Sequence, residues 1–500
     1  MNYQPSEKSQ LSLWDSWVYI TDNDVIHLFF LAGKAGCGWG YAGHAVSHDW
    51  VHWEELPPVK LSGEKGAWDE GPVGTGMVFR HDDGRYYMTY TGKLEGTQQC
   101  HGLFVSDDLM EWQKISVDGP VWPRSQQPPY EQDENRATLQ AWRDAFVTRN
   151  PEGQWEAFCA GRVDFGPHAG RGCIARCRLE SIDTWIDLPP VADVGLYAAM
   201  EVPEVFEFAG RCWAIFSTTS GWGTRVGTPE RPIAAGTFFL SADHWQGPYR
   251  AIPDNLLIGA GFNKMSAYVA RVVEYQGQHL VYHHYAGNGG PPAFGLPKVL
   301  NADGDKLYLT AWEGIDALRR GQLDLTGWQA LSNGPQAPGE WNVGGQVIHG
   351  NCEVGAAILR AETEAVDVDI EVELTIRSGA RAGLVTGLPA TPNAKGIACL
   401  LDAQAGEITI GEAYTWINAS GPNLSQIIDS VRRPVEHNRT YTVRLIHRHR
   451  YVELFVDGRL VFSTVTESVP QGGGIGCAVE DAAAAFNIRQ AYRLEPMKVE

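Results

Sequence analysis

A strand that directly follows a tight turn recurs through the first three hundred residues, and this recurrence limits the folds open to the chain more than any other feature. Each copy is a run of apolar and aromatic residues after a turn rich in Gly, Asn, Asp or Pro, which is typical of a β-hairpin. The five runs are residues 25–30, 85–90, 155–158, 212–216 and 279–283. Five such runs within the first three hundred residues indicate a repeated unit, and a four-stranded blade with its loops is a unit of that size, so the sequence predicts a five-bladed β-propeller.

A second, weaker repeat accompanies the first. In four of the predicted blades a short turn with a serine and an aspartate leads to a tryptophan. The pairs are Asp49 with Trp53, Asp108 with Trp112, Asp183 with Trp185, and Asp243 with Trp245. An aspartate in such a turn accepts hydrogen bonds from backbone amides, while the tryptophan packs between blades. We favour this structural role for these residues over a catalytic one.

The pattern changes past about residue 310, and a chain of 500 residues usually needs more than one hydrophobic core. Residues 366–374 alternate apolar and acidic side chains, as a strand with one buried face does. Asp457-Gly458 separates two further strand-like runs and is a strong hairpin signal. We therefore predict an all-β chain with a C-terminal β-sandwich. Its predicted parts are a five-bladed propeller over residues 1–312, a linker with a short helix over 313–335 and the sandwich over 336–500.

The net charge of −20 argues against two classes of partner. Nucleic acids and anionic membrane surfaces both bind basic faces, so neither is expected. No run approaches the length of a membrane-spanning helix, and residues 1–12 lack the apolar core of a signal peptide. The nine cysteines are scattered without metal-ligand spacing. We expect free thiols in a cytoplasmic protein that uses neither a metal nor a cofactor.

Three carboxylates lie among apolar or aromatic residues just before or at the start of a predicted first blade strand. They are Asp15, Asp144 and Glu201. Each alone could be a turn carboxylate or part of an ion pair between blades, but their shared position in the repeat favours function. First strands line the central channel of a propeller, so the three side chains are expected to meet at one mouth of it. Two carboxyl groups at one site are what a glycosidase needs.

These positions resemble conserved motifs of glycoside hydrolase family 32, the invertases, inulinases and levanases. The closest match is residues 41–47, which are similar to the family's Trp-Gly-His-Ala-Val-Ser stretch. Asp15 lies where the family's Trp-Met-Asn-Asp-Pro-Asn-Gly block has its nucleophile. Arg143-Asp144 corresponds to the family's Arg-Asp-Pro motif, and Glu201-Val202-Pro203 to its Glu-Cys-Pro motif. Residues 452–458 are similar to a signature of the family's C-terminal sandwich, so the resemblance extends over most of the chain.

The resemblance implies a retaining hydrolase of a furanoside, most simply a fructoside or fructo-oligosaccharide. Asp15 would be the nucleophile, Glu201 the acid/base, and Asp144 the residue that holds two ring hydroxyls and stabilises the transition state. Further candidates for contacts with the sugar are Trp14, Trp17, Trp39, Trp68, Asp69, Glu70, Arg143 and Tyr268.

Departures from the family pattern leave the substrate open. Trp14 and Ser16 replace the Asn and Pro that flank the family's nucleophile, Leu31 stands where a Gln is expected, and Ala145 replaces the Pro of Arg-Asp-Pro. Three alternatives therefore remain: an arabinofuranosidase-like enzyme, a fructosyl-transferring enzyme, or a propeller that binds carbohydrate without catalysis. The expected partner is a sugar or oligosaccharide in each case, and association into a homo-oligomer also stays open.

Overall fold

The computed structural model is all-β, as the sequence predicts. The residues it describes are 3–34, 38–93, 99–132, 141–222, 227–261, 265–286, 291–332, 339–345, 347–361, 363, 365–389, 394–414, 426–467, 469–470 and 472–497. Within these ranges, helical structure is limited to the 3-10 helices η1 (His168–Gly170), η2 (Ser220–Trp222) and η3 (Glu313–Leu318). No helix in the described part of the chain is long and apolar enough to cross a membrane.

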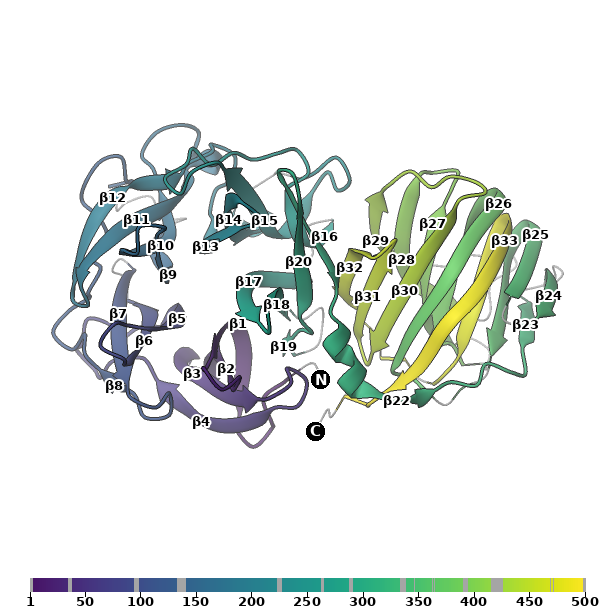
Figure 1. Ribbon diagram of the computed structural model, residues 1–500, viewed down its shortest axis with the longest axis horizontal. Helices are drawn as coiled ribbons and strands as arrows, with labels where there is room; N and C mark the ends of the chain where they lie inside the picture. The colour runs from purple at the N-terminus through teal and green to yellow at the C-terminus, as the bar shows by residue number, and fades with distance from the viewer. Residues whose placement is uncertain are drawn as a thin grey trace.

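Four separate four-stranded antiparallel sheets follow one another along the chain, and Figure 1 shows them arranged around a common centre. The first consists of β1 (Leu11–Ile20), β2 (Ile26–Lys34), β3 (Gly38–Ser47) and β4 (Glu54–Lys60). The second consists of β5 (Gly74–Arg80), β6 (Tyr86–Gly92), β7 (Cys100–Ser106) and β8 (Gln113–Lys114). The third consists of β9 (Arg143–Arg149), β10 (Trp155–Arg162), β11 (Gly172–Ser181) and β12 (Thr184–Ala192). The fourth consists of β13 (Glu201–Phe208), β14 (Arg211–Thr218), β15 (Ala234–Ala242) and β16 (Leu256–Gly261).

The expectation of five separate blades is correct for four of them only. The next strands pair in order like a blade, but they belong to a 17-stranded sheet that continues into the C-terminal half. They are β17 (Ala267–Tyr275), β18 (Gln278–Tyr285), β19 (Ala293–Phe294), β20 (Lys298–Asp303) and β21 (Lys306–Ala311). The connection is the single residue pair Thr310↔Arg459 between β21 and β32. It forms because the outer edge of β21 presents backbone groups that a neighbouring strand can pair with.

The C-terminal half folds one large sheet over on itself. Its strands are β22 (Arg319–Gln322), β23 (Gln329–Ser332), β24 (Glu340–Gly344), β25 (Val347–Ala361), β26 (Val368–Thr386), β27 (Lys395–Asp402), β28 (Glu407–Tyr414), β29 (Gln426–Arg432), β30 (Thr440–Arg448), β31 (Tyr451–Val456), β32 (Arg459–Val465) and β33 (Ile475–Leu494). The first half of β26 pairs with β30 and its second half with β27. Gly379 lies at the switch with φ +85°, where a Cβ would collide with the backbone of Asp481. Apolar side chains from both halves fill the space between the layers.

Several expected elements are confirmed in detail. The five runs after tight turns are second strands of their meanders, namely β2, β6, β10, β14 and β18. The alternating run at 366–374 begins β26, and the Asp457-Gly458 turn joins β31 to β32. In the range expected as a linker, η3 is the short helix, whereas β22 and β23 already pair with β33 and β25. The exact domain boundaries stay a prediction.

Two of the four Asp–Trp turns, those at Asp49 and Asp108, make the backbone hydrogen bonds expected for them. Asp49 Oδ1 accepts hydrogen bonds from the amides of Val51 at 3.0 Å and His52 at 2.8 Å. The indole of Trp53 donates to the carbonyl oxygen of Trp50, three residues earlier, at 3.0 Å. The turns at Asp108 and Trp112 repeat these contacts, and Trp185 repeats the indole contact. Trp245 differs, because its indole donates to the carboxylate of Glu156 in the preceding blade.

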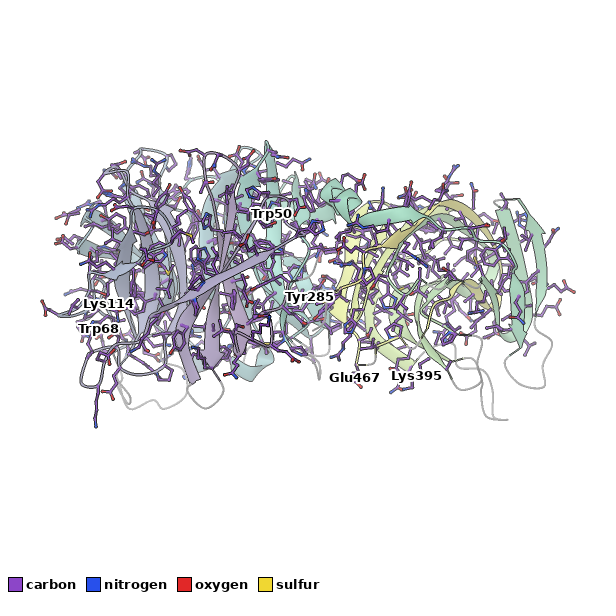
Figure 2. All side chains as sticks on the ribbon, turned by 90° about the horizontal axis from the view of Figure 1, so that it is seen from below. Trp50, Trp68, Lys114, Tyr285, Lys395 and Glu467 are labelled. Atoms are coloured by element: carbon purple, nitrogen blue, oxygen red, sulfur yellow. The ribbon has the colours of Figure 1, made fainter. Side chains whose placement is uncertain are left out.

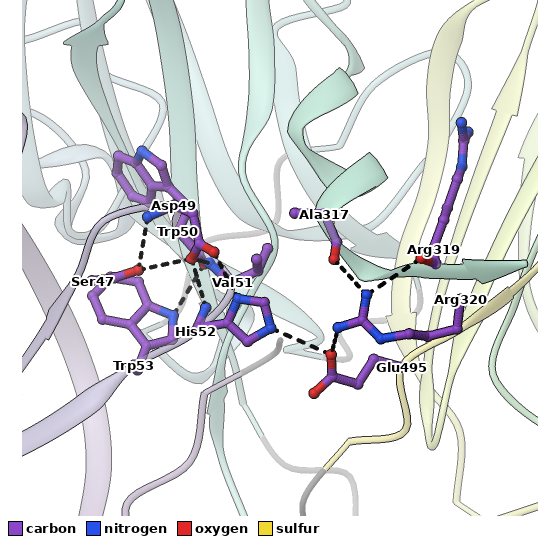
Figure 3. A network of polar contacts seen from close by, with 10 residues as sticks. All are labelled: Ser47, Asp49, Trp50, Val51, His52, Trp53, Ala317, Arg319, Arg320 and Glu495. Carbon is purple, nitrogen blue, oxygen red and sulfur yellow. Dashed lines mark hydrogen bonds and ion pairs between the residues drawn. The ribbon is translucent and has the colours of Figure 1, made fainter.

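Polar contacts join the ring of sheets to the C-terminal half. Lys298 of β20 is fully buried and binds Glu453 of β31. Tyr285, which Figure 2 labels at the junction of the two halves, donates to the same Glu453 carboxylate at 2.9 Å. Near the C-terminus, Glu495 accepts hydrogen bonds from His52 of the first blade and from Arg320 (Figure 3). Since a buried charge without its partner is costly, these pairs hold the two halves in one arrangement.

Candidate active site

The first strand of each meander carries an irregularity near its start. The register shifts near Asp15 in β1, Thr75 in β5, Asp144 in β9, Glu201 in β13 and Tyr268 in β17. Such bulges interrupt the alternation of side chains and can turn a residue out of the sheet. The backbone at Asp144 has φ +66°, a conformation that non-glycine residues rarely adopt outside functional or tightly constrained positions. The five irregularities occupy equivalent places in the repeat, so they direct these side chains toward a common region.

The structure brings Arg143, Asp144 and Glu201 into direct contact. Arg143 Nη2 donates to Glu201 Oε1 at 2.9 Å, and Arg143 Nε lies 3.5 Å from Asp144 Oδ2. The backbone amide of Val202, next to Glu201, donates to Asp144 Oδ2 at 3.2 Å. Asp144 and Arg143 are both buried, so these are charge-assisted contacts in a low-dielectric place. The start of β9 is thereby fixed against the start of β13.

Asp15 completes a trio of carboxyl groups. It is 9% exposed, and its Oδ2 accepts a hydrogen bond from the Thr75 hydroxyl of β5. Burial raises the pKa of Asp15 from 3.8 to about 8, and the negative charges of Asp144 and Glu201 add to the rise, whereas Thr75 opposes it. Burial, with the charge of Glu201, also raises the pKa of Asp144 to about 6, against the opposing effect of Arg143. The trio therefore retains a proton near neutral pH, as a pair of acid and nucleophile requires.

Two aromatic residues cover the other side of Glu201. Its Oε2 accepts hydrogen bonds from Tyr268 Oη at 2.6 Å and from Trp222 Nε1 at 2.6 Å. Tyr268 is buried at the start of β17, and burial raises its pKa well above the ordinary value, so the hydroxyl stays a donor. Trp222 ends η2 and also lies over Arg143, whose guanidinium carbon is 5.4 Å from the ring centroid.

A buried ion pair is associated with the trio. Arg271 of β17 donates through Nε to Glu204 of β13 at 2.8 Å and through Nη1 to the carbonyl oxygen of Gly76 in β5 at 2.9 Å. Glu204 also accepts the amide of Val272 at 2.8 Å. Arg271 is close enough that its positive charge lowers the pKa of Asp15 against the larger effect of burial. This pair ties three meanders together beside the candidate site.

Aromatic rings line up beside the trio. Trp14 lies next to Asp15 in the chain, and its ring centroid is 4.9 Å from His284 and 6.3 Å from Trp39. His284 in turn lies 6.2 Å from the ring of Tyr268. Trp14 and Trp39 are each partly exposed. Both remain candidates for contact with a sugar.

The other predicted contact residues serve different purposes. Trp17 is 1% exposed and stacks on Phe29, so the structure places it in the core rather than at the channel mouth. Asp69 is 1% exposed and binds Tyr90 and Lys114, an internal ion pair that leaves it unsuited to hold a sugar. The indole of neighbouring Trp68 donates to a backbone carbonyl oxygen at 2.8 Å; Figure 2 shows Trp68 and Lys114 on the side of the ring away from the sandwich. Glu70 is exposed and accepts the amide of Gly66.

Sequence reasoning missed Thr75 and Trp222. Thr75 lies at the start of the first strand of the second blade, the position that carries Asp15, Asp144 and Glu201 in the other blades. An alignment of the first strands could therefore have identified it. Trp222 lies between β14 and β15, where no pattern distinguishes it from the other tryptophans of the chain. Within the described ranges, no group of three or more His, Cys, Asp or Glu side chains is arranged to hold a metal ion.

Comparisons with known proteins agree on one family. Residues 15–254 match the family described as Glycosyl hydrolases family 32 N-terminal domain. Acid beta-fructofuranosidase 4, vacuolar, of Arabidopsis thaliana is 24% identical over 264 residues, which are 48% of this chain and 36% of that protein. Sucrose:sucrose 1-fructosyltransferase of Festuca arundinacea is 29% identical over 151 residues, which are 29% of this chain and 21% of that protein. The matched segments thus span well under half of these relatives' lengths.

A solved structure shares the whole fold. The exo-inulinase from Aspergillus awamori superposes with a TM-score of 0.67 at 15% identity, covering 99% of this chain and 100% of that one. At 15% identity, this similarity shows a shared fold and nothing more. It shows that the β-propeller-like ring and the C-terminal sheet occur together in another protein in the same arrangement.

Proposed function

We propose that the protein belongs to glycoside hydrolase family 32, whose N-terminal domain residues 15–254 match, and that it is a retaining glycosidase of fructosides. The observation that carries the proposal is the convergence of Asp15, Asp144 and Glu201 from three separate sheets. The negative charges of Asp144 and Glu201 help to raise the pKa of Asp15. Arg143 contacts both Asp144 and Glu201. A site of this composition supplies both a nucleophile and a proton donor.

Asp15 is the proposed nucleophile. Its Oδ2 is held by Thr75, while its buried Oδ1 has no hydrogen-bond partner among the described residues and is available to attack. In the first step Oδ1 forms a bond to the anomeric carbon, and the bond from that carbon to the leaving oxygen breaks. The electron pair departs with the oxygen, which takes a proton from Glu201. The reacting form of the site is the one in which Asp15 has lost its proton and Glu201 carries one.

Water completes the proposed cycle. Glu201 removes a proton from the water as its oxygen attacks the anomeric carbon, and the bond to Asp15 breaks. The two inversions leave the sugar with its original anomeric configuration. Asp144 is proposed to bind two ring hydroxyls and to stabilise the positive charge that develops on the ring. Trp14, Trp39 and Tyr268 are the proposed remaining contacts with the sugar.

We assign β17, β18, β20 and β21 to a fifth blade of the propeller in this proposal. They pair in blade order, and β17 supplies Tyr268 to the site at the place where other first strands supply carboxylates. Their connection to the sandwich does not change this role, because it involves the opposite, outermost strand of the meander.

Substrate turnover tests the function directly. The purified chain would be offered sucrose, inulin, levan and aryl furanosides, with released monosaccharide measured and its anomer followed by NMR. Fructose released first as the anomer present in the substrate is the expected result. Asp15→Asn and Glu201→Gln should each abolish turnover with unchanged circular dichroism. Release of the opposite anomer would contradict retention, and full activity of either variant would remove that residue's role.

Transfer of fructose to a second sugar is the alternative favoured by a specific observation. One of the similar proteins is a sucrose:sucrose 1-fructosyltransferase, and transfer uses the same covalent intermediate with a sugar in place of water. Products longer than the substrate at high sucrose concentration would identify it. A cytoplasmic location remains a prediction from the sequence, as does the choice between monomer and homo-oligomer.

A further inference from the structure

The carboxylate of Glu201 is surrounded by hydrogen-bond donors. Arg143 Nη2 occupies Oε1 at 2.9 Å, while Tyr268 Oη and Trp222 Nε1 occupy Oε2 at 2.6 Å each. Donors on both oxygens favour the ionised form of a carboxyl group. A proton donor, however, must at some stage carry a hydrogen on one of these oxygens.

The three donors differ in whether they can tolerate that hydrogen. A tyrosine hydroxyl can rotate and accept a hydrogen bond, but a guanidinium and an indole N–H can only donate. A proton on Oε2 that points to Tyr268 leaves the other two contacts intact, but it does not reach a leaving group. To be transferred, the proton must point to the glycosidic oxygen, so a lone pair that now accepts from Arg143 or from Trp222 has to be vacated. Arg143 is 9% exposed and also contacts Asp144 at 3.5 Å, so it is held from two sides.

Trp222 is the donor that can leave. It is 36% exposed and ends the three-residue helix η2, whereas Arg143 and Tyr268 lie buried at the starts of strands. Its ring rests over the guanidinium of Arg143, with 5.4 Å between the guanidinium carbon and the ring centroid. The indole therefore occupies Oε2 from the solvent side, where a leaving group would have to approach.

Building on the proposed function, we propose that Trp222 is a displaceable latch on the acid/base residue and the aromatic contact for the leaving-group sugar. Before substrate binds, the indole N–H donates to Glu201 Oε2. When substrate enters, the leaving-group sugar takes that place and the ring packs against the sugar's face. Glu201 Oε2 then carries the proton, which passes to the glycosidic oxygen as its bond to the anomeric carbon breaks. Trp222 is a positioning residue for Glu201 and a contact for the leaving group.

The latch predicts a difference between two pH profiles. The groups that face Glu201 are Asp15 on β1, Arg143 and Asp144 on β9, and Tyr268 on β17, and none of them changes in a Trp222 variant. In the free protein the indole N–H occupies Glu201 Oε2, where the transferred proton has to lie, so removal of the N–H should extend activity to higher pH. The pH profile of kcat/KM reports the ionisation of groups in the free protein. The profile of kcat reports their ionisation in the substrate complex, in which the indole no longer contacts Glu201.

Trp222→Phe tests the latch because it keeps an aromatic ring and removes the N–H. With sucrose as substrate, the upper pH limit of kcat/KM should rise by about one unit, the effect of one lost hydrogen bond to a charged acceptor. The upper limit of kcat should stay where it is. Equal shifts in both profiles would mean that the indole stays bound to Glu201 in the substrate complex. No shift in either profile would mean that the indole does not affect Glu201 in the free protein. Either result overturns the latch.

Trp222→Ala tests the contact with the leaving group. Loss of the ring should raise KM for sucrose about tenfold, the upper end of what one aromatic contact contributes. KM for methyl β-fructofuranoside, which has no leaving-group sugar, should stay within about twofold of the parent value under the same affinity arithmetic. Equal rises for both substrates would overturn this part of the proposal.

Trp155→Phe is the matched control. The indole of Trp155 also donates to a carboxylate, Asp82 Oδ2 at 3.1 Å, and a guanidinium also lies over its ring, that of Arg149 at 4.5 Å. It belongs to β10 and contacts none of the trio, so both pH profiles should remain those of the parent. If the parent hydrolyses no fructoside, the proposed function fails and the latch with it. An active parent with unaltered Trp222 variants removes the latch alone.

A crystal structure of the Asp15→Asn variant with bound sucrose gives a second, independent reading. The indole nitrogen of Trp222 should be beyond hydrogen-bond distance of Glu201, with the glucosyl unit between them. Sucrose bound at the trio with the indole still on Oε2 would contradict the latch, whatever the kinetics show.

Discussion

Replacing Asp15 with asparagine should stabilise the protein, and by an amount that grows with pH. The folded protein holds this carboxyl at a pKa of about 8, against 3.8 for an exposed aspartate, chiefly because of burial and then because of Asp144. Between these values the folded state retains a proton that the unfolded chain has lost. Stability of the parent therefore falls as pH rises from about 4 to about 8 and levels off above it.

The size of the effect follows from the shift in pKa. A difference of about four units, at about 1.4 kcal/mol for each, costs the parent on the order of 6 kcal/mol of unfolding free energy by pH 8. Asparagine is uncharged and can still accept the hydrogen bond from Thr75. Asp15→Asn should therefore melt at nearly the parent temperature at pH 4 and about 6 °C above it at pH 9.

Differential scanning calorimetry across this pH range is the appropriate assay. Asp118→Asn changes an exposed aspartate in the second blade's outgoing loop and is the matched control, whose melting temperature should follow the parent at every pH. A parent–variant difference that stays constant between pH 4 and pH 9 would refute the reasoning, because Asp15 would then not be buried among like charges.

Two further substitutions test neighbours of the trio. Thr75→Ala removes the hydroxyl that favours ionised Asp15, so the lower pH limit of kcat/KM for sucrose should rise by about one unit, while Thr75→Ser should restore the parent profile. Arg271→Met leaves Glu204 buried without its cation and should lower the unfolding free energy in urea by about 3–5 kcal/mol. The double variant Arg271→Met/Glu204→Leu should recover a large part of that loss, and a double variant as unstable as the single one would contradict the assignment of this pair.

The repeat made the carboxylates predictable. Asp15, Asp144 and Glu201 occupy the same place in three blades, and a propeller's geometry converts equal places in the repeat into proximity in space. A prediction from one such residue alone would have had no way to find its partners. The same register also covers Thr75, which a stricter comparison of the five first strands would have included.

Contact residues were less predictable because local irregularities and distant partners decide them. Trp17 is two residues from Asp15, and simple alternation would place both on one face, but the register shift between Leu13 and Ser16 breaks that parity. Asp69 is engaged by Lys114, 45 residues further along the chain, and no local pattern reveals such a pair. The fusion of the last meander with the sandwich depends on one residue pair between β21 and β32 and leaves no trace in the sequence.

Capture of the covalent intermediate tests the central claim most directly. A Glu201→Gln variant treated with an aryl β-fructofuranoside bearing a good leaving group should still form the first bond, since that leaving group departs without an acid, but should hydrolyse it slowly. Mass spectrometry of the digested protein should then find one fructosyl unit on the peptide that contains Asp15. Rapid release of the aryl group with the sugar attached to another carboxylate, or to none, would contradict the account.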